Sequence, residues 1–277
     1  MTTGQAVSTR SLRAAPETLV QLQINVAHVK VSVITVVRNA APHLAATLQS
    51  VSHQTETDVE HVLVDGASTD DTLAVASQHG QHLARIVSEP DSGIYDAFNK
   101  GLKLVTGDVI AFLNAGDTYA DHGVLSRVAT QFASQDVDAV YGDVLIVDVA
   151  NQSRVVRYYR SDIFRPGRLA YGFMPAHPAL FVKRNVFDRL GGFDTSFRQA
   201  GDFEFCVRAF MVQRIRHAYM AESLVRMLNG GVSNRGLRSK LINTREMRRA
   251  CLQNGLPTNY LKLSLRLPIK AIELLRR

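Results

Sequence analysis

Residues 31–37 read Val-Ser-Val-Ile-Thr-Val-Val, and this stretch decides the fold class. A short, nearly continuous run of β-branched residues is typical of a strand buried on both faces of a parallel sheet. The turn at Asn39-Ala-Ala-Pro42 ends the strand and opens a helix, whose buried face carries Leu44, Leu48 and Val51. A buried strand followed at once by an amphipathic helix indicates an α/β protein.

Strand and helix then alternate along the chain. Further strands are predicted at 61–64, 84–87 and 108–113, with helices at 73–79 and 94–105 between them. Each predicted strand ends in a short polar loop. The alternation predicts a doubly wound, mostly parallel α/β sheet, and such sheets bind ligands at the loops beyond the carboxyl ends of their strands.

Those loops, at 65–71, 89–96 and 114–117, are acidic. The sequence lacks the glycine-rich dinucleotide fingerprint, the P-loop and the nucleophile elbow, which argues against NAD-dependent enzymes, P-loop NTPases and serine hydrolases. Carboxylates accept hydrogen bonds from a nucleotide base or a ribose, and they hold hard divalent cations that bridge a diphosphate. Acidic strand ends therefore favour a nucleotide-sugar donor over nucleic acid, whose phosphates they would repel.

After residue 140 the pattern loosens into mixed strands and short helices. Strands are predicted at 140–147 and 179–182, and helices at 187–190 and 203–212. The chain divides into three parts: a partly ordered leader with one short helix at 16–22 (1–28), an α/β domain (29–231) and a basic helical tail (232–277).

The composition is that of a globular protein, with 277 residues, 46% hydrophobic and 21% charged. Cys206 and Cys251 are far apart, which excludes a disulfide scaffold and fits a reducing compartment. No apolar run approaches ~18 residues, the length of a membrane span. The N-terminus lacks the apolar core of a signal peptide, so we expect a cytoplasmic protein.

The net charge of +7 is concentrated at the C-terminus. Residues 232–277 hold eleven lysines and arginines against two acidic residues, so the remainder is slightly acidic. Two interpretations stay open: peripheral contact with an anionic membrane surface, or a solvated helical face. The final stretch, 260–277, mixes Leu and Ile with Lys and Arg, which suits an interfacial helix and equally a helix packed on the core. No nucleic-acid partner is expected, because aromatic residues are not interleaved with these charges.

Four motifs together carry a family resemblance. They are Val31–Asn39, Val64-Asp-Gly-Ala-Ser-Thr-Asp-Asp-Thr72, Ser88-Glu-Pro-Asp-Ser-Gly-Ile-Tyr-Asp-Ala-Phe-Asn-Lys-Gly101 and Gly107-Asp-Val-Ile-Ala-Phe-Leu-Asn-Ala-Gly-Asp117. In this order and spacing the chain resembles the family 2 glycosyltransferases of the GT-A fold, and among them the bacterial exopolysaccharide and colanic-acid-type enzymes. The resemblance implies a GT-A domain at 29–231 and an inverting transfer from a UDP- or GDP-linked sugar.

The resemblance implies a donor site built from the strand-end loops. Asp65 matches the position that binds the nucleotide's base. Thr35 and Arg38 match positions that line the nucleotide pocket, and Glu89 and Asp91 match the loop that faces the ribose and diphosphate. Many family members carry an arginine that contacts the diphosphate at the position of Phe98. Lys100 is the residue expected to contact the diphosphate in its place. Plainer roles remain open: a turn residue that caps the next helix for Asp65, strand-end packing for Thr35 and Arg38, a helix cap for Asp91 and a surface ion pair with Asp96 for Lys100. Gly230-Gly-Val-Ser233 resembles a loop that borders the donor.

The resemblance also implies a divalent cation, Mg²⁺ or Mn²⁺. Asn114-Ala-Gly-Asp117 stands where the family commonly has a DxD-like run. Asp117 occupies the last acidic position and is the expected metal ligand. Asn114 would contact the sugar or ribose, because an amide is a poorer ligand for a hard cation.

On the acceptor side, Ala200-Gly-Asp-Phe-Glu-Phe205 resembles the family's Glu-Asp motif, with Gly201 where glutamate is usual. Asp202 matches the catalytic base that takes the acceptor's proton, and it is equally well placed as a helix N-cap. Glu204 and His177 are the other residues expected on the acceptor side.

Three functions remain open. The first is transfer to a glycan or a lipid-linked oligosaccharide in polysaccharide biosynthesis. The second is transfer to polyprenyl phosphate itself. The third is a non-catalytic nucleotide- or glycan-binding scaffold, if the departures at Asn114 and Gly201 disable the site.

Overall fold

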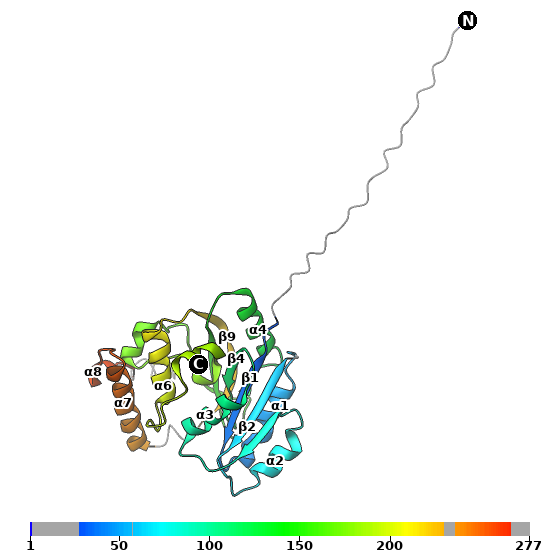
Figure 1. Ribbon diagram of the computed structural model, residues 1–277, viewed down its shortest axis with the longest axis horizontal. Coiled ribbons are helices and arrows are strands. Elements are labelled where there is room, and N and C mark those ends of the chain that lie inside the picture. The colour runs from blue at the N-terminus through cyan, green and yellow to red at the C-terminus, as the bar shows by residue number, and fades with distance from the viewer. Residues whose placement is uncertain (2–27, 57, 230–235, 267–277) are drawn as a thin grey trace.

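The computed structural model describes residues 1, 28–56, 58–229 and 236–266. The predicted leader helix at 16–22, the loop at 230–233 and the end of the tail from residue 267 lie outside the described residues. Within the described parts, nine strands form one sheet in the order β3-β2-β1-β4-β8-β6-β9-β5, with β7 paired to β6. Figure 1 shows this sheet between helices on its two faces.

The N-terminal half of the sheet is parallel. It contains β1 (Val31–Val37), β2 (Val59–Asp65), β3 (Arg85–Ser88) and β4 (Val109–Phe112). β1 lies between β2 and β4, and all seven of its residues are buried. The predicted strands are confirmed, except that β3 is a largely exposed edge strand. Because these strands are parallel, the loops after them meet at one edge of the sheet.

The C-terminal half is mixed, as the looser pattern predicts. It contains β5 (Thr118–Tyr119), β6 (Ala139–Val147), β7 (Val155–Tyr159), β8 (Leu180–Lys183) and β9 (His217–Leu228). β8 runs antiparallel to β4 and β6, and β9 runs parallel to β6. The sequence of β9, His-Ala-Tyr-Met-Ala-Glu-Ser-Leu-Val-Arg-Met-Leu, does not predict a strand. Pairing along the whole of β6 overrides its weak local preference.

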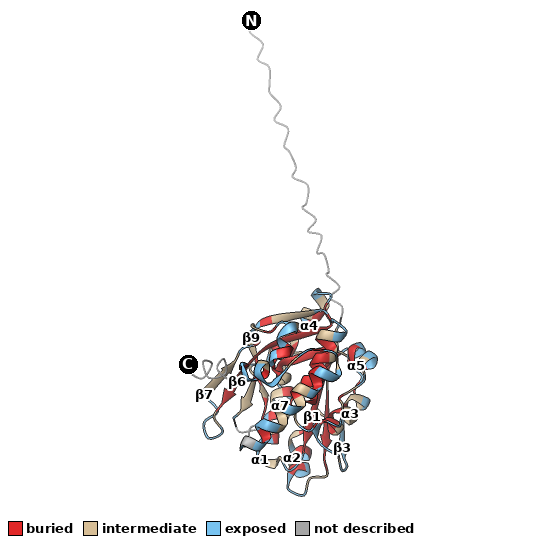
Figure 2. Ribbon diagram, turned by 90° about the vertical axis from the view of Figure 1, so that its left-hand side faces the viewer, coloured by how far each residue is buried: buried red, intermediate tan, exposed pale blue. Residues whose placement is uncertain are grey.

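Helices cover both faces of the sheet. Alternate residues of β1 point to opposite faces of the sheet, each with its own hydrophobic core. Ile34 and Val36 are buried in the core on one face, and Val31 and Val33 are buried in the core on the other face. One face carries α1 (Ala41–Ser52), α2 (Thr72–His79) and α4 (Val124–Ser134). The other carries α3 (Ile94–Leu104), α5 (Arg184–Leu190), α6 (Gly201–Cys206), α7 (Gly236–Gln253) and α8 (Tyr260–Ser264), together with 3₁₀ turns at Pro166–Tyr171 and His177–Ala179. Figure 2 shows the central strands buried and the outer helix faces exposed.

The helix predicted at 203–212 begins two residues earlier, at Gly201, and changes its winding. After α6 ends at Cys206, residues Val207–Val212 form a π-helix. Such turns occur frequently at functional sites.

The described part of the basic tail packs on the α/β domain. Met247, Ala250 and Cys251 of α7 and Leu263 of α8 are buried in the same core as α3 and α6. Figure 1 shows α7 beside α6. Residues 236–266 therefore pack on the core with one side, and the other side is exposed, with Leu241, Leu252 and Leu261 on it.

Candidate functional site

Asp65 ends β2 and is fully buried by its own loop. Its Oδ2 accepts hydrogen bonds from the backbone N–H of Ser68 at 3.0 Å and from Ser88 Oγ at 2.6 Å. Among the described residues its Oδ1 accepts from the Ser68 hydroxyl. The carboxylate is thus held by the loops after two neighbouring strands, at the edge where the sequence predicts the donor.

Arg38 and Asp91 lie beside this carboxylate, against the backbone of Gly66. A Cβ at Gly66 would stand 2.1 Å from Asp91 Oδ2 and 3.5 Å from the Cδ of Arg38. Asp91 Oδ1 accepts from the N–H of Gly93 in a turn before α3; Gly93 itself is the N-cap, so the alternative that Asp91 caps this helix is wrong. The structure therefore brings Arg38, Asp65 and Asp91 together.

Lys100 and Glu89 neutralise each other. The ammonium of Lys100 lies 2.9 Å from Glu89 Oε1 and 3.8 Å from Asp96 Oδ2, and it donates to the carbonyl of Pro90 at 2.6 Å. The hydrogen bond to Glu89 raises the pKa of Lys100. These contacts join the Glu89–Gly93 loop to α3, and the assignment of Lys100 to the diphosphate stays a prediction.

Thr35 lies inside the sheet, which corrects its prediction as a donor contact. It is fully buried, and its hydroxyl donates to the carbonyl of Leu113 at 2.7 Å. The same hydroxyl lies 2.9 Å from Nε2 of His61, whose Nδ1 lies 2.9 Å from Nε2 of His82. Burial, together with the neighbouring His82, lowers the pKa of His61 to about 3. This chain of polar groups ties β1, β2 and β4 together beneath the donor edge.

The loop after β4 is a tight turn that presents Asn114 and Asp117. The N–H of Asp117 donates to the carbonyl of Asn114 at 2.9 Å, and Gly116 takes the positive φ of 96° that the turn requires. Thr47 of α1 fixes this turn: its hydroxyl donates to the carbonyl of Asp117 at 2.8 Å and accepts from the N–H of Gly116 at 3.0 Å.

The polar side-chain groups of Asn114 and Asp117 in this turn have free acceptor oxygens within the described chain. The residue Asp117 is only 9% exposed, and burial raises the pKa of its carboxyl to about 8. Within the described parts of the chain its carboxylate has no hydrogen-bond or ion-pair partner, and Oδ1 of Asn114 is buried without a partner. A buried carboxylate without a partner is the kind of group that a hard cation takes as a ligand, and the free amide oxygen is an acceptor for a hydroxyl. Among the described residues there is no cluster of three or more His, Cys, Asp or Glu that could hold a metal ion by itself.

Asp202 lies at the start of α6, on the face of the sheet that also carries α3. Its Oδ1 accepts from the hydroxyl of Tyr95 at 3.0 Å and from the N–H of Phe203 at 2.9 Å. Oδ2 of Asp202 has no hydrogen-bond partner in the described regions, so one oxygen of this half-exposed carboxylate is available as a base.

The loop before α6 is fixed by the tail. Oε1 and Oε2 of Glu246, in α7, accept hydrogen bonds from the consecutive backbone N–H groups of Arg198, Gln199 and Ala200 at 2.8–3.0 Å. Neither Glu246 nor Thr47 is predicted from the sequence, because each acts through backbone groups far along the chain. Tyr95 lies inside the third of the four motifs, yet the sequence does not predict its hydrogen bond to Asp202.

A family model described as Glycosyl transferase family 2 matches residues 32–191, more than half of the chain. The chain belongs to glycosyltransferase family 2. A curated relative, the PGL/p-HBAD biosynthesis glycosyltransferase of Mycobacterium tuberculosis (strain ATCC 25177 / H37Ra), is 34% identical over 198 residues, which cover 69% of this chain and 75% of the relative. The protein is therefore a glycosyltransferase, as the four motifs predict.

Solved structures share the fold. The mannosyltransferase PcManGT of Pyrobaculum calidifontis, in complex with GDP-Man and Mn²⁺, superimposes with a TM-score of 0.63 at 20% identity, over 90% of this chain and 74% of that one. TarS 1–349 of S. aureus, in complex with UDP-GlcNAc, gives a TM-score of 0.62 at 16% identity, over 86% and 71% of the two chains. At these identities the likeness shows the GT-A fold, which confirms the predicted fold class.

Glu204 of the transferase is part of a buried ion pair. It is 2% exposed, and its two carboxylate oxygens accept from Nε of Arg208 at 2.8 and 2.9 Å. Asn254 of α7 donates to the same carboxylate at 3.1 Å. Arg208 in turn donates to the carbonyls of Leu190 and Gly192, so this ion pair joins the helices around the acceptor side.

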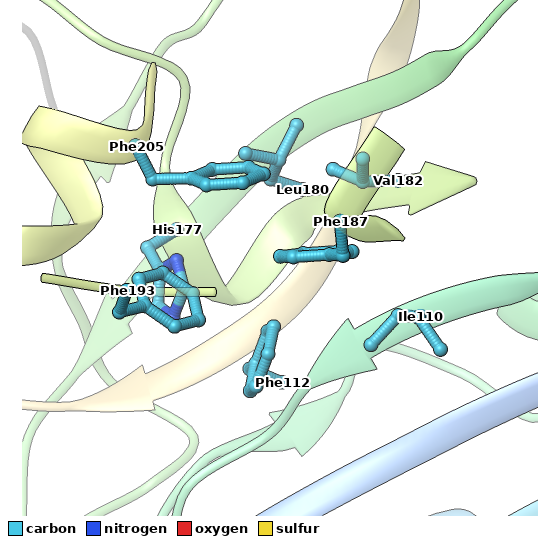
Figure 3. A pocket seen from close by; sticks show the side chains of 8 residues that line it. All are labelled: Ile110, Phe112, His177, Leu180, Val182, Phe187, Phe193 and Phe205. Carbon is cyan, nitrogen blue, oxygen red and sulfur yellow. The ribbon is translucent and has the colours of Figure 1, made fainter. Parts of the chain in front are cut away.

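His177 lies behind Asp202 in an apolar pocket. Figure 3 shows its ring beside Phe193 and the other lining residues, Ile110, Phe112, Leu180, Val182, Phe187 and Phe205. Burial lowers the pKa of His177, and the nearby Asp202 opposes this shift. Its Nε2 is buried without a partner in the described chain. His177 is thus a neutral group near the base, enclosed by aromatic rings.

Among the described helices, none is both long and apolar enough to cross a membrane.

Proposed function

We propose that this glycosyltransferase inverts the anomeric centre as it moves a sugar from a nucleoside-diphosphate sugar to a hydroxyl of a glycan or lipid-linked oligosaccharide. The observation that carries the proposal is the presence of acidic groups with unoccupied oxygens on two different elements. Asp117 follows β4 at the carboxyl ends of the parallel strands, and Asp202 lies at the start of α6 with Oδ2 unoccupied among the described residues. The first group suits a donor with its cation, and the second suits the hydroxyl of an acceptor.

The donor site would use the strand-end residues in turn. An N–H of the base replaces the hydroxyl of Ser68 at Oδ1 of Asp65, while Arg38 and Asp91 border the nucleotide where they meet Gly66. Asn114 contributes its free Oδ1 to the sugar or ribose. A Mg²⁺ or Mn²⁺ ion on Asp117 supplies positive charge to the departing diphosphate when it is bound.

The acceptor step would use Asp202. The acceptor oxygen attacks the anomeric carbon from the face opposite the diphosphate, and Oδ2 of Asp202 takes the hydroxyl proton. The bond from the anomeric carbon to the diphosphate oxygen breaks, and its electron pair leaves with the nucleoside diphosphate. One displacement inverts the configuration, and Asp202 ends the step protonated.

The ligands of two solved structures with the same fold support a nucleoside-diphosphate sugar as the donor. PcManGT is described with GDP-Man and Mn²⁺, and TarS with UDP-GlcNAc. These titles leave both UDP- and GDP-linked sugars in consideration. The retained Asp117 and Asp202 argue against the scaffold alternative, because each departure from the family motif leaves an acidic group in a usable position.

Calorimetric titration with UDP, GDP and dTDP, each with and without Mn²⁺ or Mg²⁺, tests the donor site. We expect one nucleotide to bind more tightly with the cation. Asp117→Asn should remove the cation's effect, and Asp65→Asn should weaken binding by roughly tenfold or more, the value of a charge-assisted hydrogen bond. Asp188→Asn, at an exposed position on α5, is the matched control.

Release of the nucleoside diphosphate from a panel of UDP-, GDP- and dTDP-sugars then identifies the donor. Failure of every nucleotide to bind would overturn the proposal. If a nucleotide binds equally tightly with and without the cation, the donor site is supported and the role of Asp117 as a metal ligand is overturned.

The acceptor class proposed here is a lipid-linked chain in exopolysaccharide-type synthesis at the cytoplasmic face of the membrane. Its support is a mixed surface on the tail. Leu241, Arg245, Arg248 and Leu252 follow one another at spacings of four, three and four residues, so they share one face of α7. Leu241 and Leu252 are 61% and 44% exposed, and Arg245 is exposed. Alternating cations and exposed leucines suit an anionic lipid interface.

The face continues onto α8. The guanidinium of Arg248 lies over the ring of Tyr260, 5.2 Å from its centroid, and the next residue, Leu261, is 72% exposed.

Sedimentation with vesicles tests this contact. The full chain should bind vesicles that contain phosphatidylglycerol and not vesicles of phosphatidylcholine alone. The double variant Arg245→Glu, Leu261→Glu should lose most of the binding, whereas Ile86→Glu, at an exposed position of the edge strand β3, should keep it. Equal binding to both kinds of vesicle, or none to either, would point to a glycan that is not lipid-linked.

A further inference from the structure

Tyr95 links the donor side of the molecule to the acceptor side. It is the second residue of α3, which begins directly after the Glu89–Gly93 loop. Its side chain is buried, and its hydroxyl donates to Oδ1 of Asp202 in α6, 107 positions along the chain. Its ring lies 5.8 Å from that of Phe193 and 6.1 Å from that of Phe98, so the phenol is held by packing on both sides.

The hydrogen bonds at Asp202 make its two oxygens unequal. Oδ1 accepts from Tyr95 and from the N–H of Phe203, which satisfies it. Oδ2 accepts from no group in the described chain. A carboxylate fixed in this way keeps one oxygen for the hydrogen bond and presents the other to the acceptor.

Gly201 provides the space that Tyr95 occupies. A Cβ at position 201 would lie 2.8–3.0 Å from three carbons of the Tyr95 ring, closer than side chains approach. The family resemblance places a glutamate at this position, and such a side chain cannot coexist with the ring where it stands. The Tyr95 ring therefore occupies the space that a side chain at position 201 would fill, and this position of the ring requires a glycine at 201.

We propose that Tyr95 is a positioning residue for the catalytic base. It holds Oδ1 of Asp202, stabilises the ionised carboxylate and leaves Oδ2 as the oxygen that takes the acceptor's proton. Through α3 it also connects the orientation of the base to the donor loop. This inference rests on the proposed function, in which Asp202 is the base.

Three titratable groups face Asp202 and bear on any pH dependence. They are Tyr95 itself, His177 from the 3₁₀ turn after Ala176, and Cys206 at the end of α6. Burial raises the pKa of Tyr95 and of Cys206 above their usual ranges and lowers that of His177, so all three are neutral at pH 7. Asp117 at the donor edge also has a raised pKa, so only a difference between variants, and not the acid limb itself, bears on the acceptor side.

The test compares Tyr95→Phe with the native protein on the nucleotide sugar that the donor panel identifies. Loss of a donor to the carboxylate should move the acid limb of kcat against pH to higher pH and lower kcat by roughly tenfold, a part of what general-base catalysis supplies. The affinity for the nucleoside diphosphate, measured by calorimetry, should not change. Tyr119→Phe is the matched control, because it removes a buried phenol hydroxyl that has no partner in the described structure.

A second variant and a stability measurement keep the test decisive. Gly201→Ala should shift the profile in the same direction, since its Cβ displaces the ring. In a double-mutant cycle of Tyr95→Phe and Asp202→Asn, the two together should lower the unfolding midpoint by less than the sum of the separate effects. An unshifted profile in Tyr95→Phe, with Asp202→Asn inactive, would overturn this inference and leave the proposed function intact. Full activity in Asp202→Asn would instead remove the base assignment itself.

Discussion

The two halves of the sheet hold their functional carboxylates in different ways. Asp65, in the parallel half, receives its hydrogen bonds from the loop that follows it and from the end of the next strand. Asp202, in the mixed half, is held by Tyr95 from far earlier in the chain, and its loop by Glu246 from the C-terminal helix. The donor edge is thus built from local motifs, whereas the acceptor side is assembled from distant segments. Changes in the tail should alter the acceptor side and spare the donor edge.

The largest expected effect is that of Asp202→Asn. The amide keeps the size of the side chain and cannot take a proton, so kcat should fall by roughly 10²- to 10⁴-fold. Binding of the nucleoside diphosphate should be unchanged, because the donor edge is built without Asp202. Steady-state kinetics and calorimetry on one preparation measure both. A matching loss of nucleotide affinity would show that the two halves are not independent.

The next effect is that of Glu246→Gln. The substitution removes the charge that accepts three backbone N–H groups, so we expect a loss of about 2 kcal/mol in the free energy of unfolding. The loop before α6 should loosen and kcat should fall, again without a change in nucleotide affinity. Chemical denaturation and kinetics measure the two changes.

The matched control for Glu246→Gln is Glu222→Gln. Glu222 makes a partly exposed ion pair with Arg127 at 2.9 Å, and such pairs contribute about 0–1 kcal/mol. If the two variants behave alike, the tail does not position the acceptor side.

The smallest expected effect is an acid sensitivity of the parallel half. Burial lowers the pKa of His61 to about 3 in the folded chain, against about 6.5 in the unfolded one. The unfolded chain therefore takes up a proton between pH 7 and pH 5 that the folded chain does not. The free energy of unfolding should fall by about 2 kcal/mol over this range through His61 alone. Urea midpoints at pH 7 and pH 5 measure it.

His61→Gln should flatten that pH dependence, whereas His43→Gln, at an exposed position on α1, should leave it unchanged. Equal slopes in all three proteins would mean that the chain of polar groups beneath the donor edge does not govern acid stability.

The sequence predicts the parallel half well, because its signals are local. The β-branched run at 31–37 and the acidic strand ends predict the strands, the helices between them and the edge where Asp65 and Asp117 lie. The sequence does not show which side chains already have partners in the folded chain. Thr35 bonds to the carbonyl of Leu113, Lys100 pairs with Glu89, and Glu204 pairs with Arg208.

The structure of the mixed half is set by contacts between strands and helices rather than by the local sequence pattern. β9 is a strand because β6 lies beside it, and residues 236–266 are part of the core because α6 and α3 offer an apolar surface. The motif Ala200–Phe205 predicts Asp202 as an acidic group on a helix, which the structure bears out. Its free oxygen, by contrast, depends on Tyr95.

By itself the sequence determined the fold class, the family and the acidic groups at the strand ends, since hydrophobic period and strand-end chemistry are properties of consecutive residues. Only the tertiary structure decided which of those groups are free. A carboxylate, a hydroxyl or an ammonium can bind a ligand only where no other part of the chain already occupies it, and that depends on contacts between residues tens of positions apart.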